Sequence, residues 1–363
     1  MAEQTTRTEK PIPSGPLSFL RGGANGNIVR LLLAVIIIFV AMSLLRPDAF
    51  LKVRNMQSMA FQASEIGVLA IAIMVTMLSG GIDLSIVSTA NLSGIVAGLI
   101  LGAMVTPDSA PGQVALGMAV AIGAALLVGF ACGAFNGLTV AVLGFPPILA
   151  TLGTLLAYKG LGTAITKGTT IFGVAQSQFI GNGLIGKTVP VPLIILIVVA
   201  LIMAVILGKT RFGLRLYMLG TNPTAARFSG INNRRVLWTS YVMSGVLAAI
   251  AGIIILGRTN AANVDFGGPY VLLSILIAVL GDVDPYGGSG SVWGVLLALV
   301  GVQFLSTGVN MLLFQSSGAN FFKEFSWGAL LLIVLLVNYY SHRAQQRRLM
   351  PVAETAAEAS ALR

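Results

Sequence analysis

Residues 190–257 alternate between apolar and charged sequence. They read PVPLIILIVVALIMAVILG (190–208), KTRFGLRLYMLGTNPTAARFSGINNRR (209–235) and VLWTSYVMSGVLAAIAGIIILG (236–257). Each apolar run has about 20 residues, the length that an α-helix needs to cross the hydrocarbon core of a bilayer. The segment between them carries six basic residues and no acidic residue. This pattern predicts two membrane spans joined by a basic loop outside the membrane.

The rest of the chain repeats this alternation. Of its 363 residues, 56% are apolar and 9% are charged, whereas about 25% of a soluble domain is charged. This composition excludes most soluble enzyme folds, and the continuous apolar runs exclude an outer-membrane barrel, whose strands alternate apolar and polar residues. We therefore expect an all-α membrane protein with about ten transmembrane helices. The expected spans are 28–45, 63–80, 85–105, 113–143, 147–166, 190–208, 236–257, 270–282, 291–309 and 325–340. The fourth is overlong and the eighth is short, so we expect kinked or partly re-entrant helices at both.

Basic residues predict the orientation of these spans. Residues 1–27 are polar and read as a mobile cytoplasmic tail, residues 28–340 form the transmembrane domain, and residues 341–363 form a second cytoplasmic tail. With both termini in the cytoplasm, fourteen Lys and Arg fall on the cytoplasmic side and seven on the outer side, as the positive-inside rule requires. The net charge of +10 therefore reflects topology and lipid contact, not binding to nucleic acid.

The loop 209–235 contains the signals of a very short helix. Asn222 suits an N-cap, Pro223 the first helical position, and Gly230 the left-handed position after the last turn. A helix of barely two turns is unstable alone in water, so it needs a surface on which to dock. Small residues with Phe228 as an anchor suit a groove on a cytoplasmic partner, although an ordinary surface turn is an equal alternative.

Polar residues inside the expected spans are candidates for a translocation path. Glu65 and Lys159 are ionisable and therefore costly in the bilayer, but each lies near a span end and could reach the interface. The uncharged candidates could bind a neutral polyol, although bonding between helices is the usual role of such groups. They are Asn91, Asn136, Thr151 and Thr154.

Motifs for catalysis and metal binding are weak. Residues 181–188, GNGLIGKT, fit the phosphate-loop pattern, but no apolar strand precedes them and a proline-rich segment follows, so we reject an ATP site. The single Cys132 and single His342 exclude a cysteine cluster or an intramembrane histidine centre. Asp282 and Asp284 resemble half of an acidic metal site, but a solvated turn-rich loop is the better interpretation. We expect no metal site.

Several ordered motifs resemble the permeases of sugar-type ATP-binding-cassette (ABC) importers, the ribose, xylose and autoinducer-2 branch. The loop 208–231 is similar to the coupling-loop signature of that family, and GGIDLS (80–85) to its most recognisable motif. PILATLG (147–153) and GGSGS (287–291) follow in family order. The resemblance covers about residues 30–340.

This resemblance implies a ten-span permease with an inverted five-plus-five repeat in the bacterial inner membrane. It implies a second permease chain (the same or homologous), two cytoplasmic ATPase domains that use ATP and Mg, and a periplasmic sugar-binding protein. The chain itself would bind no cofactor and would not be an enzyme. The coupling helix would comprise Asn222, Pro223, Ala225, Ala226, Phe228, Ser229 and Gly230, flanked by Lys209, Arg211 and Arg215, and the family motif would comprise Gly81, Asp83 and Ser85.

We thus expect import of a small neutral sugar or sugar-like molecule, of ribose, other monosaccharide or autoinducer-2 type. Similarity of residues 189–194 and 342–347 to the autoinducer-2 branch favours pairing with a different permease. The alternative function is an ion-gradient-driven secondary transporter, which would be expected to hold a carboxylate deep in a span. An intramembrane Asp-dependent transferase is a weaker alternative, because one acidic pair without histidine lacks the necessary groups.

Overall fold

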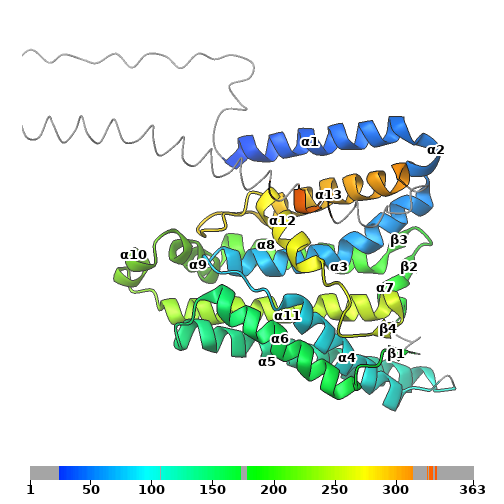
Figure 1. Cartoon of the computed structure of the whole chain (residues 1–363), viewed down its shortest axis with the longest axis horizontal. Coiled ribbons are helices and arrows are strands. Elements are labelled where there is room, and N and C mark those ends of the chain that lie inside the picture. The colour runs from blue at the N-terminus through cyan, green and yellow to red at the C-terminus, as the bar shows by residue number, and fades with distance from the viewer. Residues whose placement is uncertain are drawn as a thin grey trace, which may run out of the picture.

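The computed structural model describes residues 24–106, 108–172, 178–313, 325, 327–329 and 332. Within them, eight helices are long and apolar enough to cross a membrane. These are α1 (Ala24–Leu45), α3 (Val53–Met77), α4 (Ile86–Met104), α5 with its π-helical extension η2 (Pro111–Gly137 and Leu138–Val142), α6 (Pro147–Thr166), α8 (Val191–Lys209), α11 (Asn233–Thr259) and α13 (Val292–Leu312). A ninth, shorter apolar helix is α12 (Tyr270–Leu280). These helices run side by side in Figure 1.

Nine of the ten expected spans thus correspond to apolar helices. The tenth, 325–340, lies almost entirely outside the described residues, as do both predicted tails. The short eighth span is confirmed, because α12 has 11 residues. The overlong fourth run ends in the π-helical turn η2, which changes the helix geometry where the chain leaves the bundle. One boundary was wrong by ten residues: α3 begins at Val53, because the polar residues that precede Ala63 are helical too.

The centre of the bundle is formed by α3, α4 and α11. The most apolar windows of α3 and α11 are each 83% buried, and α11 packs against α3, α4 and α5. Small residues allow this close packing. A Cβ at Gly133 would meet the carbonyl group of Tyr241, and one at Gly94 would lie 3.2 Å from the Gly252 carbonyl oxygen. Glycines thus allow the helix backbones to approach closely there, whereas Gly102 at the end of α4 faces open space.

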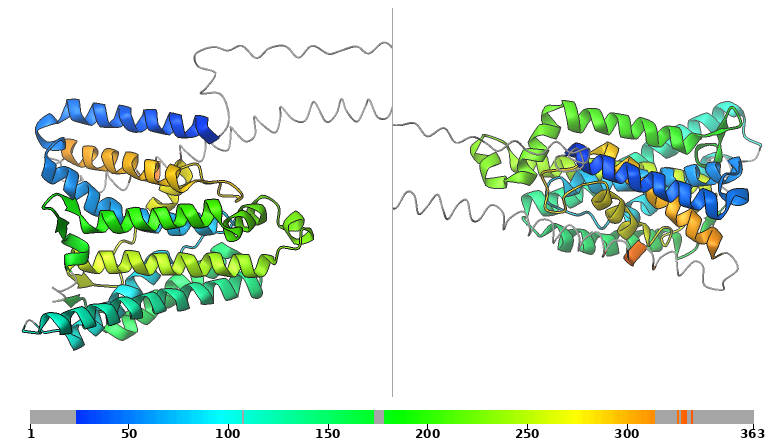
Figure 2. Two further views of the ribbon diagram at one scale, coloured as in Figure 1. Left: turned by 180° about the vertical axis from the view of Figure 1, so that it is seen from behind. Right: turned by 90° about the horizontal axis from the view of Figure 1, so that it is seen from above.

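The connecting segments divide between the two ends of the bundle. The α10 end carries α9 (Arg211–Thr221) and α10 (Pro223–Phe228). Figures 1 and 2 place these helices at one extremity and the short strands at the other. At this opposite, hairpin end, β1 (Ile171–Phe172) pairs with β4 (Ala261–Ala262), and β2 (Leu184–Ile185) pairs with β3 (Val189–Pro190). Two further short helices, α2 (Pro47–Phe50) and α7 (Gln178–Asn182), complete the described elements.

The phosphate-loop pattern, residues 181–188, runs from the end of α7 through β2 into the turn of the β2–β3 hairpin. Residues 184–190 form the β2–β3 hairpin, and its turn places Gly186 and Lys187 at positive φ angles of 62°. A phosphate loop instead connects a strand to a helix whose N-terminus faces the anion. The fold therefore gives this pattern no phosphate-binding geometry.

Candidate functional site

The helix α10 is formed by the local signals that the sequence contains. The Asn222 side-chain oxygen accepts hydrogen bonds from the backbone N–H groups of Thr224 and Ala225, both at 3.0 Å. Gly230 has a φ of 78° and follows the last turn. The Asn233 amide donates to the Pro223 carbonyl oxygen at 2.8 Å, which ties the start of α10 to the start of α11. The loop is therefore folded although α10 is short.

The exposed face of α10 is apolar at its tip. Phe228 is 87% exposed, whereas Ala226 is 1% exposed and packs within the loop. Ala226 thus supports the loop from inside, and Phe228 is the side chain free to contact a partner. The remaining residues predicted for this loop are also exposed: Pro223 and Ala225 on α10, Asn222, Ser229 and Gly230 at its two ends, and Lys209, Arg211 and Arg215 earlier in the loop. An exposed aromatic ring and exposed basic side chains are thus presented at this end of the bundle.

Three segments meet through glycine beneath this loop. The Gly288 N–H donates to the Leu78 carbonyl oxygen at 3.0 Å. A Cβ at Gly220, near the end of α9, would overlap both Leu78 and Gly288. The Tyr217 hydroxyl donates to the Gly290 carbonyl oxygen at 2.9 Å. Backbone thus packs directly against backbone where α9 meets the loops 78–85 and 281–291.

The loop 78–85 contains a buried carboxylate. Asp83 is 1% exposed, and its Oδ1 accepts from the Ser85 N–H at 3.0 Å, the Ser85 hydroxyl at 2.7 Å and the Asn136 amide at 3.4 Å. Its Oδ2 accepts from the Ser244 hydroxyl at 3.0 Å. Burial raises the pKa of the Asp83 carboxyl, and the hydrogen bonds oppose that rise. Asp83 thus joins its own loop to α5 and α11.

Gly81 in the same motif allows a close approach. A Cβ there would lie 2.5 Å from the Tyr241 hydroxyl and 3.2 Å from the Pro147 Cβ. The Thr151 hydroxyl donates to the Ile82 carbonyl oxygen at 3.1 Å. The motif Gly81, Asp83 and Ser85 is therefore a packing centre that joins α5, α6 and α11.

The uncharged path candidates are engaged in bonds within the protein. The Asn91 amide donates to the carbonyl oxygens of Val264 and Phe266 at 2.9 and 2.8 Å. Asn136 bonds Ser85 at 2.7 Å and accepts from the Tyr158 hydroxyl at 3.1 Å, and Thr154 donates to the Thr151 carbonyl oxygen of its own helix at 3.2 Å. All four residues are thus engaged inside the protein, Asn136, Thr151 and Thr154 with groups on helices or at their ends and Asn91 with the loop between β4 and α12.

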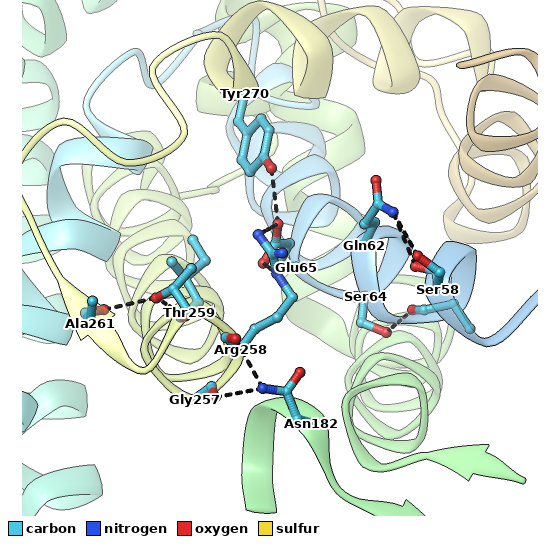
Figure 3. A network of polar contacts seen from close by, with 12 residues as sticks. Ser58, Gln62, Ser64, Glu65, Asn182, Gly257, Arg258, Thr259, Ala261 and Tyr270 are labelled. Atoms are coloured by element: carbon cyan, nitrogen blue, oxygen red, sulfur yellow. Dashed lines mark hydrogen bonds and ion pairs between the residues drawn. The ribbon is translucent and has the colours of Figure 1, made fainter. Parts of the chain in front are cut away.

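Glu65 was expected near a span end, and that expectation was wrong. Because α3 begins at Val53, Glu65 lies in mid-helix, and its side chain is fully buried. Arg258 at the end of α11 forms a two-pronged ion pair with it, Nε to Oε2 at 2.7 Å and Nη2 to Oε1 at 2.9 Å. The Tyr270 hydroxyl at the start of α12 donates to Oε1 at 3.0 Å. Figure 3 shows the three side chains converging from three helices.

Lys159 and the acidic pair lie at the surface. Lys159 forms an ion pair with Asp265 at 2.6 Å, and the two side chains are 47% and 67% exposed. This exposure agrees with the expectation that the Lys159 side chain could reach the membrane interface. Asp282 has a φ of 68°, and the Asp284 carboxylate accepts from the Tyr286 N–H at 2.9 Å. Both acids therefore belong to a turn. The described residues contain no cluster of three or more His, Cys, Asp or Glu that could hold a metal ion.

Residues 55–337 match the family described as "Branched-chain amino acid transport system / permease component". The chain belongs to this permease family. It is also similar to the autoinducer 2 import system permease protein LsrD of Enterobacter sp. (strain 638), with 31% identity over 75% of this chain and 80% of the relative. The LsrD protein of Yersinia enterocolitica is 30% identical over 75% of this chain and 79% of the relative. No solved structure matches.

The permease is thus a multi-pass membrane subunit of an ABC transporter and is not itself an enzyme. The resemblance seen in its sequence motifs is confirmed. Importers of this kind generally include ATPase and binding-protein partners. Sequence reasoning missed Arg258, Tyr270 and Ser244, which complete the two buried networks. Their signal is only that each is a polar residue close to or within an apolar run.

Proposed function

We propose that the permease imports a small neutral sugar or sugar-like molecule, of ribose, other monosaccharide or autoinducer-2 type, across the bacterial inner membrane. Support for the substrate class comes from relatives named as autoinducer 2 permeases. The polar interior agrees with an uncharged cargo, since Glu65 and Arg258 neutralise one another and the Asp83 carboxylate is surrounded by donors.

The observation that carries the proposal is the folded, exposed loop around α10. In our proposal α10 is the coupling helix, which inserts Phe228 into a groove on a cytoplasmic ATPase, flanked by Lys209, Arg211 and Arg215. Two such ATPase domains, using ATP and Mg, serve a pair of permease chains that are identical or homologous. A periplasmic binding protein delivers the cargo at the hairpin end, and both termini lie in the cytoplasm.

The glycine contacts supply a route for coupling. When the ATPases close, α10 and α9 move together, and the backbone contacts of Gly220 transmit that movement to Leu78 and Gly288. The loop 78–85 then carries it to Asp83 and hence to α5 and α11. Such a shift between an outward-open and an inward-open arrangement of an inverted five-plus-five repeat is how we expect the cargo to cross.

An ion-gradient-driven mechanism needs a carboxylate that can bind and release a cation inside the membrane. Glu65 is in the right place for that role, but two charge-assisted hydrogen bonds from Arg258 and one hydrogen bond from Tyr270 hold it. These contacts favour a structural role for Glu65 and therefore the ATP-driven proposal.

The test is to purify the tagged permease from its native membrane in mild detergent and to identify co-purifying chains by mass spectrometry. We expect an ABC ATPase, together with either a second copy or a homologous permease. In parallel, sugar uptake by the reconstituted complex is expected to require internal ATP and to survive an ionophore that abolishes ion gradients. Uptake that ends with the ionophore and continues without ATP would overturn the proposal.

A further inference from the structure

The segment 263–269, between β4 and α12, enters the bundle without forming a helix. It leaves the hairpin end after β4, and its Phe266 carbonyl oxygen accepts from the Asn91 amide at 2.8 Å. Met104 ends α4 on the hairpin side, where this helix packs against β4 and β1. At a rise of 1.5 Å per residue, Asn91 lies about 20 Å from Met104 along α4. The segment therefore reaches well inside the membrane-spanning region.

The helix α12 starts at that depth and covers only part of a bilayer. Its 11 residues extend for about 16 Å, whereas the hydrocarbon core is about 30 Å thick. Gly267, at a φ of 66°, and Pro269, the N-cap residue, interrupt the helix before Tyr270. The Tyr270 hydroxyl bonds Glu65 in the middle of α3 at 3.0 Å. Irregular backbone at residues 263–269 thus lies at membrane depth.

An exposed ion pair joins this segment to α6. The Lys159 Nζ lies 2.6 Å from the Asp265 Oδ1, and 47% and 67% of the two side chains are exposed. Lys159 is residue 13 of the 20 in α6. Its stem alone can extend toward the interface, but the short Asp265 side chain, one residue before Phe266, holds the ammonium group at the level of the segment. Two charges are therefore exposed inside the span.

Lipid is an unfavourable environment for both features. Charged side chains in a bilayer are costly and usually face the bundle interior or a water-filled cavity. Irregular backbone is tolerated at membrane depth only where it is buried in protein or lines such a cavity. The described residues of the chain leave Asp265 and Lys159 exposed, and Gly268 and Pro269 are exposed as well. Contact with water explains the charges and the irregular backbone together.

We propose that α6 and the segment 263–269 form one wall of a water-filled passage, with the Lys159–Asp265 ion pair at its surface. The two charges sum to zero, so the pair does not select an ion by net charge. The carboxylate accepts hydrogen bonds and the ammonium group donates them, and sugar hydroxyls can meet both. This inference rests on the proposed import of a sugar-like cargo and assigns that cargo a path.

Thiol labelling of the full importer in lipid nanodiscs, where reagent reaches both membrane faces, tests the wall. Cys132→Ala removes the single cysteine of the chain. Leu156→Cys then places a thiol one turn from Lys159, about 60° away around α6. Leu161→Cys is the matched control, because it lies about 160° away from Lys159 on the same helix. The two leucines are 64% and 52% exposed.

We expect a charged methanethiosulfonate to modify Leu156→Cys on the order of tenfold faster than Leu161→Cys, because the reaction needs an ionised thiol in water. Depth works against this expectation, since Leu161 lies nearer the end of α6. Equal rates, or a faster reaction at Leu161→Cys, would overturn the wall. Disulfide cross-linking of Leu156→Cys between two permease chains, without labelling, would assign this face to a dry subunit interface and would also overturn it.

The charges of the pair supply a second readout, the ratio of the rates with an anionic and a cationic methanethiosulfonate. In the Leu156→Cys background, Asp265→Asn leaves Lys159 unbalanced and should raise this ratio about fivefold at low ionic strength, as for a charge about 8 Å away in water. Lys159→Met should lower it by a similar factor, and the double variant should restore it. Loosening of the fold cannot produce opposite shifts. Lys52→Met, at the start of α3, should leave the ratio unchanged.

Uptake of D-ribose and autoinducer 2 by the same importer separates this inference from the proposed function. An importer that transports either molecule but shows no difference between Leu156→Cys and Leu161→Cys would overturn the wall and leave the function standing. Fast labelling of Leu156→Cys with the opposite charge shifts, in an importer that transports neither molecule, would support the wall and contradict the proposed substrate class.

Discussion

The side chain of Phe228 provides the sharpest test of the α10 loop. It is 87% exposed, so Phe228→Ala removes little from the fold of the isolated chain, and we expect stability to change by no more than about 0.5 kcal/mol. If the ring is buried in an ATPase groove, its loss removes about 1.5–3 kcal/mol of apolar burial. At about 1.4 kcal/mol for each tenfold change in Kd, the affinity for the ATPase should fall by about 10- to 150-fold.

The assay is a titration of the purified ATPase onto the permease in lipid nanodiscs, with Kd measured by biolayer interferometry. Phe172→Ala is the matched control, because Phe172 is 75% exposed and lies in β1 at the opposite end. We expect the control to bind the ATPase as the unmodified protein does. A Kd for Phe228→Ala within twofold of the unmodified value, or an equal loss in Phe172→Ala, would refute α10 as the docking element.

Three further predictions concern the fold. Arg258→Gln leaves the buried Glu65 carboxylate without its cation and should lower the free energy of unfolding by about 3–5 kcal/mol. Thermal unfolding in detergent should show this loss. A double variant, Glu65→Gln with Arg258→Gln, that is no more stable than Arg258→Gln alone would contradict this account. Asn222→Ala removes the N-cap of α10 and should destabilise this helix by about 1 kcal/mol. Hydrogen exchange at the amides of residues 224–228 should then become about fivefold faster. In the control Asn222→Asp, which keeps a capping oxygen, the exchange rate of these amides should not change. Gly133→Ala forces a methyl group against the α11 backbone and should destabilise the bundle by about 1–3 kcal/mol, while Gly102→Ala, which faces open space, should unfold at an unchanged temperature.

The sequence could predict the features that depend on short-range physics. A span is determined by a continuous apolar run, so nine runs correspond to apolar helices in the structure. The loop around α10 was equally predictable, because Asn222, Pro223 and Gly230 each act on backbone groups within a few residues. The start of α3 was missed because a polar lead into an apolar run can be loop or helix. Only its packing against the rest of the protein decides between them.

The ion pair between Glu65 and Arg258 could not be predicted, because 193 residues separate its partners. Glu65 was interpreted alone, as a group near a span end, and Arg258, which directly follows the expected span 236–257, was not singled out. Packing of α11 against α3 brings them together, and a single sequence does not contain that pairing. The same limit applied to Asp83, whose motif was recognised but whose partners Asn136 and Ser244 lie on two other helices.

The polar residues of the spans show what a single sequence can distinguish and what it cannot. Asn91 and Asn136 each find partners on another segment. A lone polar residue in a span therefore carries little information about a path, since one neighbouring carbonyl or hydroxyl is enough to satisfy it. The helix α13 differs, because four of its polar residues share one face: Gln303, Ser306, Thr307 and Asn310. Satisfying a whole face requires an extended polar surface opposite it. Helical periodicity of polar residues, more than their presence, is thus the sequence signal that points to an extended polar surface opposite the helix.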